Sequence, residues 1–465
     1  MLADPGVPLN RISTVAATPA QSAYCNIATT NRCAPRAADT RLKDNHVPAC
    51  RAIDVLLLDA ESRQTLACMR AYARGGLRVG AVACDSDAWW APAFKSRWCS
   101  QSAVVPHYAR DADGYVDALL ELLDRQPIQM VLPAHDGSIQ AIRPRRVEIE
   151  RRTALPLASE SALDIAISKE RTLELATELR IAIPRSVRMD RIEDVARGLR
   201  EIGLPAVVKP IQSWVERDGL GTRLSSELVT SATEAQRSLE WIFKVGGSAL
   251  LQQWLPGRRE AVSVLYAQNR FWARVAQVSH REWPVLGGVS VLCETIPLPP
   301  DITEQAERLV GAMALEGCSM VEFRRDAEGR PVLMEVNPRI GGSVALPISA
   351  GVNFPQLLFD WKVRGLLQEV TDYTVGKRLR WLAGDIWNLK CVFDSQGQPD
   401  VPPRRRAAAD FLLDFVRPNI DLDVIDMKDI RPALAELNKI VLHHGLNRVR
   451  KLSPLNWLTN AGKVN

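Results

Sequence analysis

The sequence predicts a protein of the α/β and α+β classes, in which a small doubly wound sheet precedes a larger α+β body. Strands and helices alternate from Ile53 to Pro133, which is the pattern of a parallel sheet with crossover helices. Antiparallel strands follow, most clearly between Cys318 and Ser343. The length of 465 residues exceeds one ordinary domain and fits two to four domains by the rough rule of ~150 residues each.

The composition is that of an ordinary globular protein, with 46% apolar and 24% charged residues. The net charge of +5 is small for this length, so we expect no nucleic-acid partner. The nine cysteines are scattered without a C-x-x-C pair or a zinc-like arrangement of histidines. Reduced thiols and a cytoplasmic location are therefore expected. Because no apolar run approaches ~18 residues, we expect no transmembrane segment.

Residues 1–50 show no hydrophobic periodicity and are predicted to be a disordered leader. Asp4 and Pro5, together with the lack of an apolar core, argue against a secretory signal. We assign no chemistry to this segment.

Residues 51–145 are predicted to form the doubly wound sheet, with strands at 55–58, 79–83, 104–105 and 130–133. The segment lacks the glycine fingerprint of dinucleotide binding. Ligands of such sheets bind at the carboxyl ends of the strands. The residues in that position are Asp59, Ser62, Arg63, His135 and Asp136. Helix capping and turn formation explain the same residues equally well.

The α+β body is expected over residues 146–370. Lys169 opens a helix, and Lys209 stands at the exit of a buried strand. A turn-rich loop with Gly219 and Gly221 follows. A glycine loop of this kind is weak evidence for phosphate binding by itself, and no P-loop sequence occurs.

The strongest local signal is a hairpin with the turn Asp326–Gly329. Its pattern predicts that Glu322 faces Leu333, with Glu335 and Asn337 on the same side of the sheet. Buried carboxylates that lie close together need a cation between them. An all-oxygen ligand set suits Mg²⁺. A surface hairpin whose glutamates face water is the alternative, and the apolar residues on both strands weigh against it.

From about Leu155 to Leu367 the chain resembles the ATP-grasp superfamily. The resemblance rests on six elements that occur in order: Lys169, Val207–Pro210, the glycine loop, Gln252–Gly257 with Glu260, Glu322, and Glu335–Arg339. The segment before them resembles the pre-ATP-grasp domain of such enzymes. The pattern is closest to carboxylate–amine ligase-like members related to the carbamoyl-phosphate synthase large chain. The resemblance implies a pre-ATP-grasp domain followed by a two-lobed ATP-grasp domain, with ATP held between the lobes.

The resemblance also implies roles for individual residues. In the nucleotide site, Lys169 and Lys209 would contact phosphates, the loop around Gly219 and Gly221 would close over them, Gln252, Gln253, Trp254 and Leu255 would line the adenine pocket, and Glu260 would lie near the ribose. Glu322, Glu335 and Asn337 would hold one or two Mg²⁺ ions, with Mn²⁺ able to substitute. Trp214 departs from the small residues that often follow the Lys-Pro pair, so the closing geometry of the loop is open.

The implied reaction joins a small-molecule carboxylate to a small-molecule amine through an acyl phosphate, with release of ADP and phosphate. Arg339 and Lys209 are the expected catalytic cations, and Arg281 is a candidate to hold the carboxylate, as is Arg274 to a lesser degree. Both could instead be ordinary surface arginines. A non-catalytic ATP-binding regulatory protein with the same fold is the second hypothesis, and the full set of metal ligands and lysines favours the enzyme.

Residues 371–465 are predicted to be a C-terminal extension. A returning strand is expected near Leu379–Trp387, a basic linker at Pro402–Arg406, and an amphipathic helix from Asp429 to His444. The basic run has no interleaved aromatic residues, so a solvated linker is favoured over a nucleic-acid contact. A homodimer is compatible with this arrangement.

Overall fold

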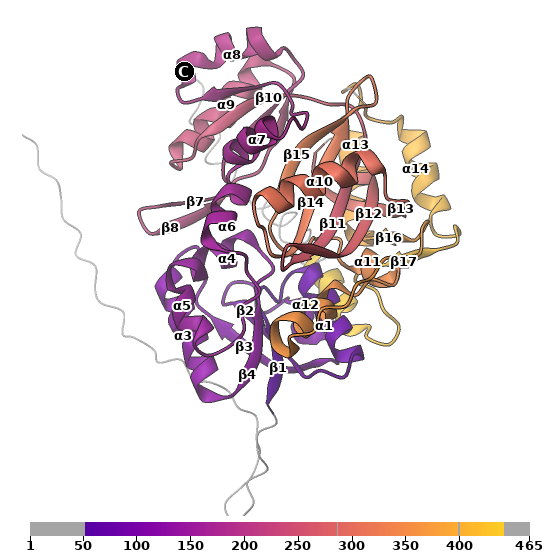
Figure 1. Cartoon of the computed structure of the whole chain (residues 1–465). Coiled ribbons are helices and arrows are strands. Elements are labelled where there is room, and N and C mark those ends of the chain that lie inside the picture. The colour runs from indigo at the N-terminus through magenta and orange to yellow at the C-terminus, as the bar shows by residue number, and fades with distance from the viewer. Residues whose placement is uncertain (1–51, 286, 399, 441–465) are drawn as a thin grey trace, which may run out of the picture. The chain divides into compact units, whose positions relative to one another are not determined.

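The computed structural model describes residues 52–285, 287–398 and 400–440, and Figure 1 shows how their helices and strands are arranged. The predicted leader at residues 1–50 lies outside the described residues. The predicted helix from Asp429 to His444 is described only as far as residue 440, and residues 431–440 are helical. None of the helices in these ranges is long and apolar enough to cross a membrane.

A parallel sheet of four strands opens the described chain, in the order β3-β2-β1-β4. Its strands are β1 (Ile53–Leu57), β2 (Val79–Cys84), β3 (Cys99–Val105) and β4 (Ile128–Leu132). The flanking helices are α1 (Arg63–Arg74), α2 (Pro92–Lys95), α3 (Ala112–Arg125), α4 (Asp136–Ile142), η1 (Arg143–Arg145) and α5 (Arg146–Glu150). The doubly wound prediction is confirmed. β3 is longer than predicted because it is an edge strand, and its first exposed positions are the polar residues Ser100 and Ser102.

The order of these strands defines a crevice. The chain runs from β1 to β2 and β3 on one side and returns to β4 on the other side. The carboxyl ends of β1 and β4 therefore flank the topological switch point, where open α/β sheets bind ligands.

Helices α6 (Glu160–Ile167) and α7 (Lys169–Glu178) lead from the first sheet to an antiparallel sheet of order β5-β10-β6-β9. Its strands are β5 (Ser186–Met189), β6 (Ala206–Pro210), β9 (Glu227–Val229) and β10 (Ala249–Gln253). The elements η2 (Ile192–Asp194), α8 (Val195–Ile202) and α9 (Ala232–Lys244) accompany it, and both α-helices share its apolar core. A separate hairpin is formed by β7 (Trp214–Arg217) and β8 (Leu220–Arg223).

The third sheet has seven strands in the order β15-β14-β11-β12-β13-β16-β17. They are β11 (Arg259–Ala267), β12 (Arg270–Trp283), β13 (Val289–Ile296), β14 (Gly317–Arg325), β15 (Pro331–Asn337), β16 (Arg378–Arg380) and β17 (Ile420–Leu422). The accompanying helices are α10 (Pro300–Ala312), α11 (Ala345–Ser349), α12 (Phe354–Arg364), α13 (Leu382–Asp394) and α14 (Arg404–Leu413). The second and third sheets are the two predicted lobes of the α+β body.

The chain beyond residue 370 is built into the third sheet, because β16 and β17 form its edge. The strand expected at Leu379–Trp387 is wrong for most of its length, since α13 begins at Leu382. The basic run Arg404–Arg406, expected in a linker, is the first turn of α14. Pro403 precedes this helix and three alanines follow the arginines, which favours helix formation.

The last described segment packs against helix α1. Arg70 of α1 is 5% exposed. Its guanidinium donates to the carboxylate of Asp429 (3.0 Å) and to the carbonyl oxygens of Asp423 (3.3 Å), Val424 (3.0 Å) and Asp429 (3.0 Å). Arg63 forms a further ion pair with Asp423. These acceptors satisfy a cation that would otherwise be costly to bury.

Replacing Gly257 by alanine is expected to destabilise the fold. An added Cβ would lie 2.3 Å from the backbone oxygen of Arg325, and overpacking of this kind costs about 1–3 kcal/mol. Gly311, in α10, is the matched control because no atom lies within 4 Å of an added Cβ. The Gly311→Ala variant should be neutral or stabilised by up to about 1 kcal/mol. Urea denaturation measures both, and equal free energies of unfolding would contradict the prediction.

Candidate functional site

The two predicted acids lie opposite one another on the hairpin of β14 and β15. Glu322 pairs with Glu335, whereas Leu333, predicted to face Glu322, pairs with Phe323. The predicted register was wrong for two reasons. Arg325 pairs with Pro331, so the turn is one residue longer than predicted, and Met334 is an extra residue in β15, which makes a β-bulge. The bulge brings the carboxylates into one cross-strand pair, closer than the predicted diagonal arrangement.

Two lysines accompany this acid pair. Lys209, in β6, is 5% exposed, and its Nζ donates to the carbonyl oxygen of Met334 (2.7 Å). Burial lowers the pKa of Lys209 to about 8, although the charge of Glu335 opposes the shift. Lys169, the first residue of α7, donates from Nζ to Ser213 Oγ (2.9 Å). The second sheet thus supplies Lys209 and helix α7 supplies Lys169, while the third sheet supplies the two acids.

The two carboxylates have different surroundings. Burial raises the pKa of Glu322, although Arg259 Nη1 lies 3.1 Å from its Oε2. Burial alone would also raise the pKa of Glu335, but Lys209 and Lys169 hold it below its usual value. Within the described residues the Glu335 carboxylate has neither a hydrogen bond nor an ion pair. The oxygens of this carboxylate are therefore not used by other described residues.

Two neighbouring pockets meet at Met334 and Glu335. The first is lined by Asp136, Ile139, Gln140, Ala166, Ile167, Lys169, Thr172, Ser213, Trp214, Met334, Glu335, Val336, Asn337 and Pro338. The second is lined by Val207, Lys209, Ser226, Leu228, Gln252, Gln253, Trp254, Leu255, Arg259, Gly287, Glu322, Arg324, Met334 and Glu335. The fold therefore brings both predicted lysines, the segment Gln252–Leu255, Glu322 and Asn337 into the two pockets that share Glu335.

Three charged residues of this site were missed from the sequence. Arg259 faces Arg324 across β11 and β14, and two adjacent cations need an anion. Glu282 supplies it, with its carboxylate 3.1 Å from Arg259 Nε and 2.8 Å from Arg324 Nη2. The alternation of charged residues along β11 and β14 could have predicted Arg259 and Arg324. The position of Glu282 could not be predicted in this way, because it depends on bulges in β12.

Glu260, which was expected near the ribose, lies outside both pocket linings. Its carboxylate accepts two hydrogen bonds from Arg325, at 3.0 and 2.8 Å, and it lines neither pocket. Arg259, one residue earlier, takes the pocket position because alternate residues of a strand face opposite sides.

The glycine loop is an ordered hairpin. Its turn residues Asp218 and Gly219 have φ of 53° and 73°, as a two-residue hairpin turn requires. Gly221 donates its N–H to the carbonyl oxygen of Ala109 (2.7 Å), and Trp214 contacts Tyr108 edge-to-face. The hairpin thus rests on the first sheet's domain, with its base at the first pocket and its two glycines outside the lining of either pocket.

Arg281 does not lie in either pocket lining. Its guanidinium binds Asp385 bidentately (2.6 and 2.8 Å) and Asp414 (2.5 Å). Its donors are therefore used by the protein itself, and its candidate role in substrate binding stays a prediction that this arrangement does not support. Arg274 likewise pairs with Glu307.

Arg339 connects the site to the first sheet. Its Nε lies 2.6 Å from Asp136 Oδ1, at the start of α4, and its Nη2 lies 3.4 Å from Asn337 Oδ1. Burial would raise the pKa of Asp136, but Arg339 holds it well below its usual value. Asn337 also donates to Glu322 (3.3 Å), so a continuous polar chain runs from the first sheet to the acid pair.

Comparison with known proteins agrees with this architecture. The family described as ATP-grasp in the biosynthetic pathway with Ter operon matches residues 248–384, which include the acid pair. This region of the chain is therefore similar to the ATP-grasp family. The biotin carboxylase domain of 2-oxoglutarate carboxylase from Hydrogenobacter thermophilus has a TM-score of 0.54 at 14% identity, over 70% of this chain and 74% of that one. N5-carboxyaminoimidazole synthetase from Staphylococcus aureus, complexed with ADP, has a TM-score of 0.51 at 15% identity, over 70% and 80%. Both similarities concern the fold.

Curated relatives match part of the chain by sequence. D-alanine–D-alanine ligase B from Pseudomonas putida is 24% identical over 42% of this chain and 63% of its own length. Formate-dependent phosphoribosylglycinamide formyltransferase from Anaeromyxobacter dehalogenans is 26% identical over 50% of this chain and 60% of its own length. The chain thus spans less than two thirds of the length of these relatives.

The side chains at the acid pair fit the magnesium that the ATP-grasp resemblance implies. Glu322 and Glu335 present carboxylate oxygens, and the third oxygen donor of the set, the Asn337 amide oxygen, accepts from Arg339 (3.4 Å) in this structure. Glu335 has no protein partner among the described residues. Arg259 balances the charge of Glu322, which leaves Glu335 as the principal charge available to an ion.

Proposed function

We propose that this chain is an ATP- and Mg²⁺-dependent ligase that activates a carboxylate as an acyl phosphate and joins it to an amine. ADP and phosphate are the other products. The observation that carries the proposal is the meeting of two pockets at Glu335, with Lys169 in one lining and Lys209 in the other. Phosphoryl transfer depends mainly on positioning and charge neutralisation, which this set of residues provides.

The second pocket is the proposed nucleotide site. The segment Gln252–Leu255 lines it and would hold the adenine ring, while Lys209 would bind a phosphate. Glu322, Glu335 and Asn337 would hold Mg²⁺, which neutralises phosphate charge when bound. The hairpin of β7 and β8 would cover the phosphates from its base at Trp214.

The first pocket is the proposed place of carboxylate activation. Arg339 and Lys169 would neutralise the carboxylate and the transferred phosphoryl group, since Lys169 lines the pocket and Arg339 contacts two of its lining residues, Asp136 and Asn337. Asp136 would orient Arg339 through their ion pair. The acyl phosphate would then react with the amine, which forms the C–N bond and releases phosphate. The names of the curated relatives, a D-alanine–D-alanine ligase and a formate-dependent formyltransferase, support this class of reaction.

Turnover is expected to convert ATP into ADP and phosphate, with no AMP. The measurement is a screen of carboxylate and amine pairs in which nucleotide products are separated by chromatography. Calorimetry on the same protein should show ATP binding that weakens sharply when EDTA removes Mg²⁺. AMP as the only nucleotide product would refute the acyl-phosphate route, and equal ATP affinity with EDTA would refute the metal assignment.

A further inference from the structure

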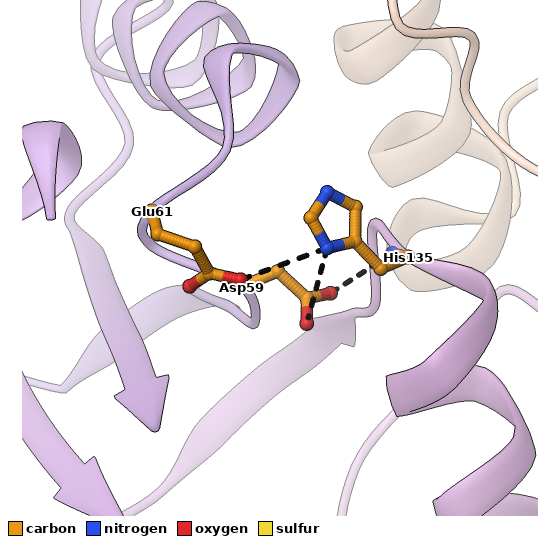
Figure 2. A group of neighbouring side chains, drawn as sticks. All are labelled: Asp59, Glu61 and His135. Carbon is orange, nitrogen blue, oxygen red and sulfur yellow. Dashed lines mark hydrogen bonds and ion pairs between the residues drawn. The ribbon is translucent and has the colours of Figure 1, made fainter. Parts of the chain in front are cut away.

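A second cluster of polar side chains lies away from the acid pair, at the switch point of the first sheet. Asp59 follows β1, Glu61 comes two residues later, and His135 follows β4. Their carboxylate oxygens and an imidazole nitrogen all lie within 4.8 Å of one another. Figure 2 shows the three side chains pointing toward one another from the two loops.

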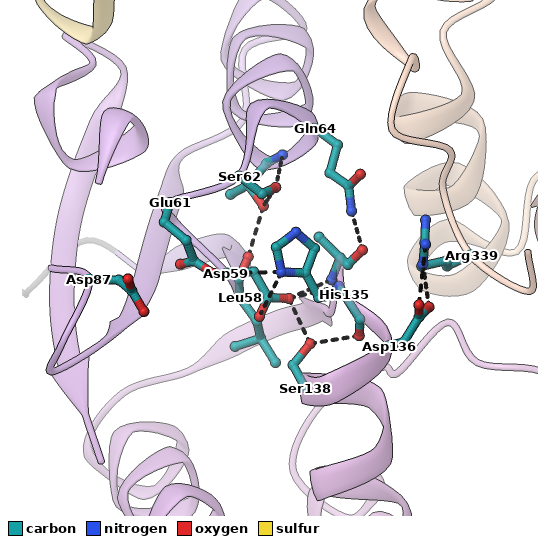
Figure 3. A network of polar contacts seen from close by, with 12 residues as sticks. Leu58, Asp59, Glu61, Ser62, Gln64, Asp87, His135, Asp136, Ser138 and Arg339 are labelled. Atoms are coloured by element: carbon teal, nitrogen blue, oxygen red, sulfur yellow. Dashed lines mark hydrogen bonds and ion pairs between the residues drawn. The ribbon is translucent and has the colours of Figure 1, made fainter. Parts of the chain in front are cut away.

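Asp59 is held rigidly in this cluster. It is 4% exposed, and its Oδ2 accepts hydrogen bonds from the backbone N–H groups of Ala134 and His135 (both 2.9 Å) and from Ser138 Oγ (2.6 Å). Figure 3 shows these contacts around the β4–α4 turn. Its Oδ1 has no hydrogen bond among the described residues and faces His135. A carboxylate fixed through one oxygen and open at the other is typical of a supported metal ligand.

The distances within the cluster are too long for hydrogen bonds. His135 Nδ1 lies 3.6 Å from Glu61 Oε1 and 4.0 Å from Asp59 Oδ1, beyond the usual 2.7–3.2 Å range. An ion about 2.0–2.2 Å from each ligand would separate tetrahedral ligands by roughly 3.4 Å. The observed spacing therefore suits three groups that share an ion.

Glu61 supplies a second, independent observation. Its Oε2 is buried and has no hydrogen-bond partner within the described residues. No lysine or arginine of the described chain forms an ion pair with Asp59 or Glu61. Lys439 is close enough for its charge to act on Glu61 but forms no ion pair with it. Two carboxylates withdrawn from water without a cation in direct contact would be strongly unfavourable.

We propose that Asp59, Glu61 and His135 form a binding site for a divalent transition-metal ion of the zinc class. One imidazole nitrogen and two carboxylate oxygens favour such an ion over Mg²⁺, which prefers oxygen alone. The ion would tie the end of β1 to the β4–α4 turn. Asp136, next to His135, pairs with Arg339, so the ion would also fix the residue that orients this arginine. The site is separate from the proposed Mg²⁺ site and does not depend on ATP.

Cobalt(II) titration of the full-length, chelator-treated protein without nucleotide tests the proposal. The wild-type protein should bind one high-affinity equivalent, with visible absorption of nitrogen and oxygen ligation and a rise in melting temperature. Zn²⁺ should displace the cobalt, and a large excess of Mg²⁺ should not. The Glu61→Gln and His135→Gln variants should each lose at least about tenfold in affinity.

Two controls keep the result specific. Asp85→Asn removes an exposed carboxylate that follows β2 and pairs with Arg110, and Glu335→Gln removes the acid of the proposed Mg²⁺ site. Both should bind cobalt like the wild-type protein. Affinity unchanged in Glu61→Gln and His135→Gln, no binding by the wild-type protein, or a thiolate charge-transfer band would each overturn the proposal. Melting temperatures in EDTA establish that every variant is folded.

Discussion

Glu335→Gln is expected to abolish ligase turnover while the protein remains folded. The substitution keeps the shape of the side chain and removes the negative charge that Lys209 and Lys169 stabilise. Loss of one electrostatic contact to the transferring group typically costs about 10²–10³-fold in rate. The fold should tolerate the change, because the Glu335 carboxylate makes no hydrogen bond or ion pair within the described residues.

The matched control is Glu328→Gln in the turn of the same hairpin. Glu328 is 65% exposed on its side chain and pairs only with Arg330 among the described residues, so turnover and stability should both be near those of the wild-type protein. The measurements are ADP release and melting temperature. Wild-type turnover by Glu335→Gln at an unchanged melting temperature would mean that the acid pair is structural.

Asp385→Ala should cause the largest loss of stability that the structure predicts. Asp385 is fully buried and accepts hydrogen bonds from Arg281 (2.6 and 2.8 Å) and Arg380 (2.7 Å). Arg380 is 1% exposed, so removal of the carboxylate leaves a buried cation with too few acceptors. Breaking a buried ion pair from one side costs about 3–5 kcal/mol.

Asp394→Ala tests the same chemistry at the end of the same helix. Asp394 is 61% exposed on its side chain and pairs with Lys390 one turn earlier, so the expected change is below about 1 kcal/mol. Urea denaturation gives both free energies of unfolding. A loss for Asp385→Ala no larger than that for Asp394→Ala would show that other groups compensate the two arginines.

The sequence predicted those features that depend on neighbouring residues. Continuous apolar runs revealed the buried strands β1 and β2, and the turn at Asp326–Gly329 revealed the hairpin that carries the acid pair. The register of that hairpin was beyond local reasoning, because the turn is one residue longer than predicted and the bulge at Met334 shifts the partners that follow it.

The residues whose roles the sequence did not predict well are those whose ion-pair partners are distant in the chain. Arg281 reads as a free cation until Asp385, 104 residues away, is brought against it. Glu260 similarly reads as a pocket residue until Arg325 is seen to occupy its carboxylate. Arg259 was overlooked because it precedes a more conspicuous acid. A pattern indicates which side chains carry charge, and only the fold determines which of those charges are already neutralised.

The contacts of Arg70 have a consequence for the order of events during synthesis. This arginine belongs to α1, which is synthesised soon after β1, yet its acceptors lie 353 to 359 residues later in the chain. Until that segment emerges, the nascent first sheet carries an unsatisfied cation on the surface that will become buried. The domain of the first sheet is therefore completed only after the segment from Asp423 to Asp429 has been made, and a chain that stops before Asp423 would leave Arg70 without these acceptors.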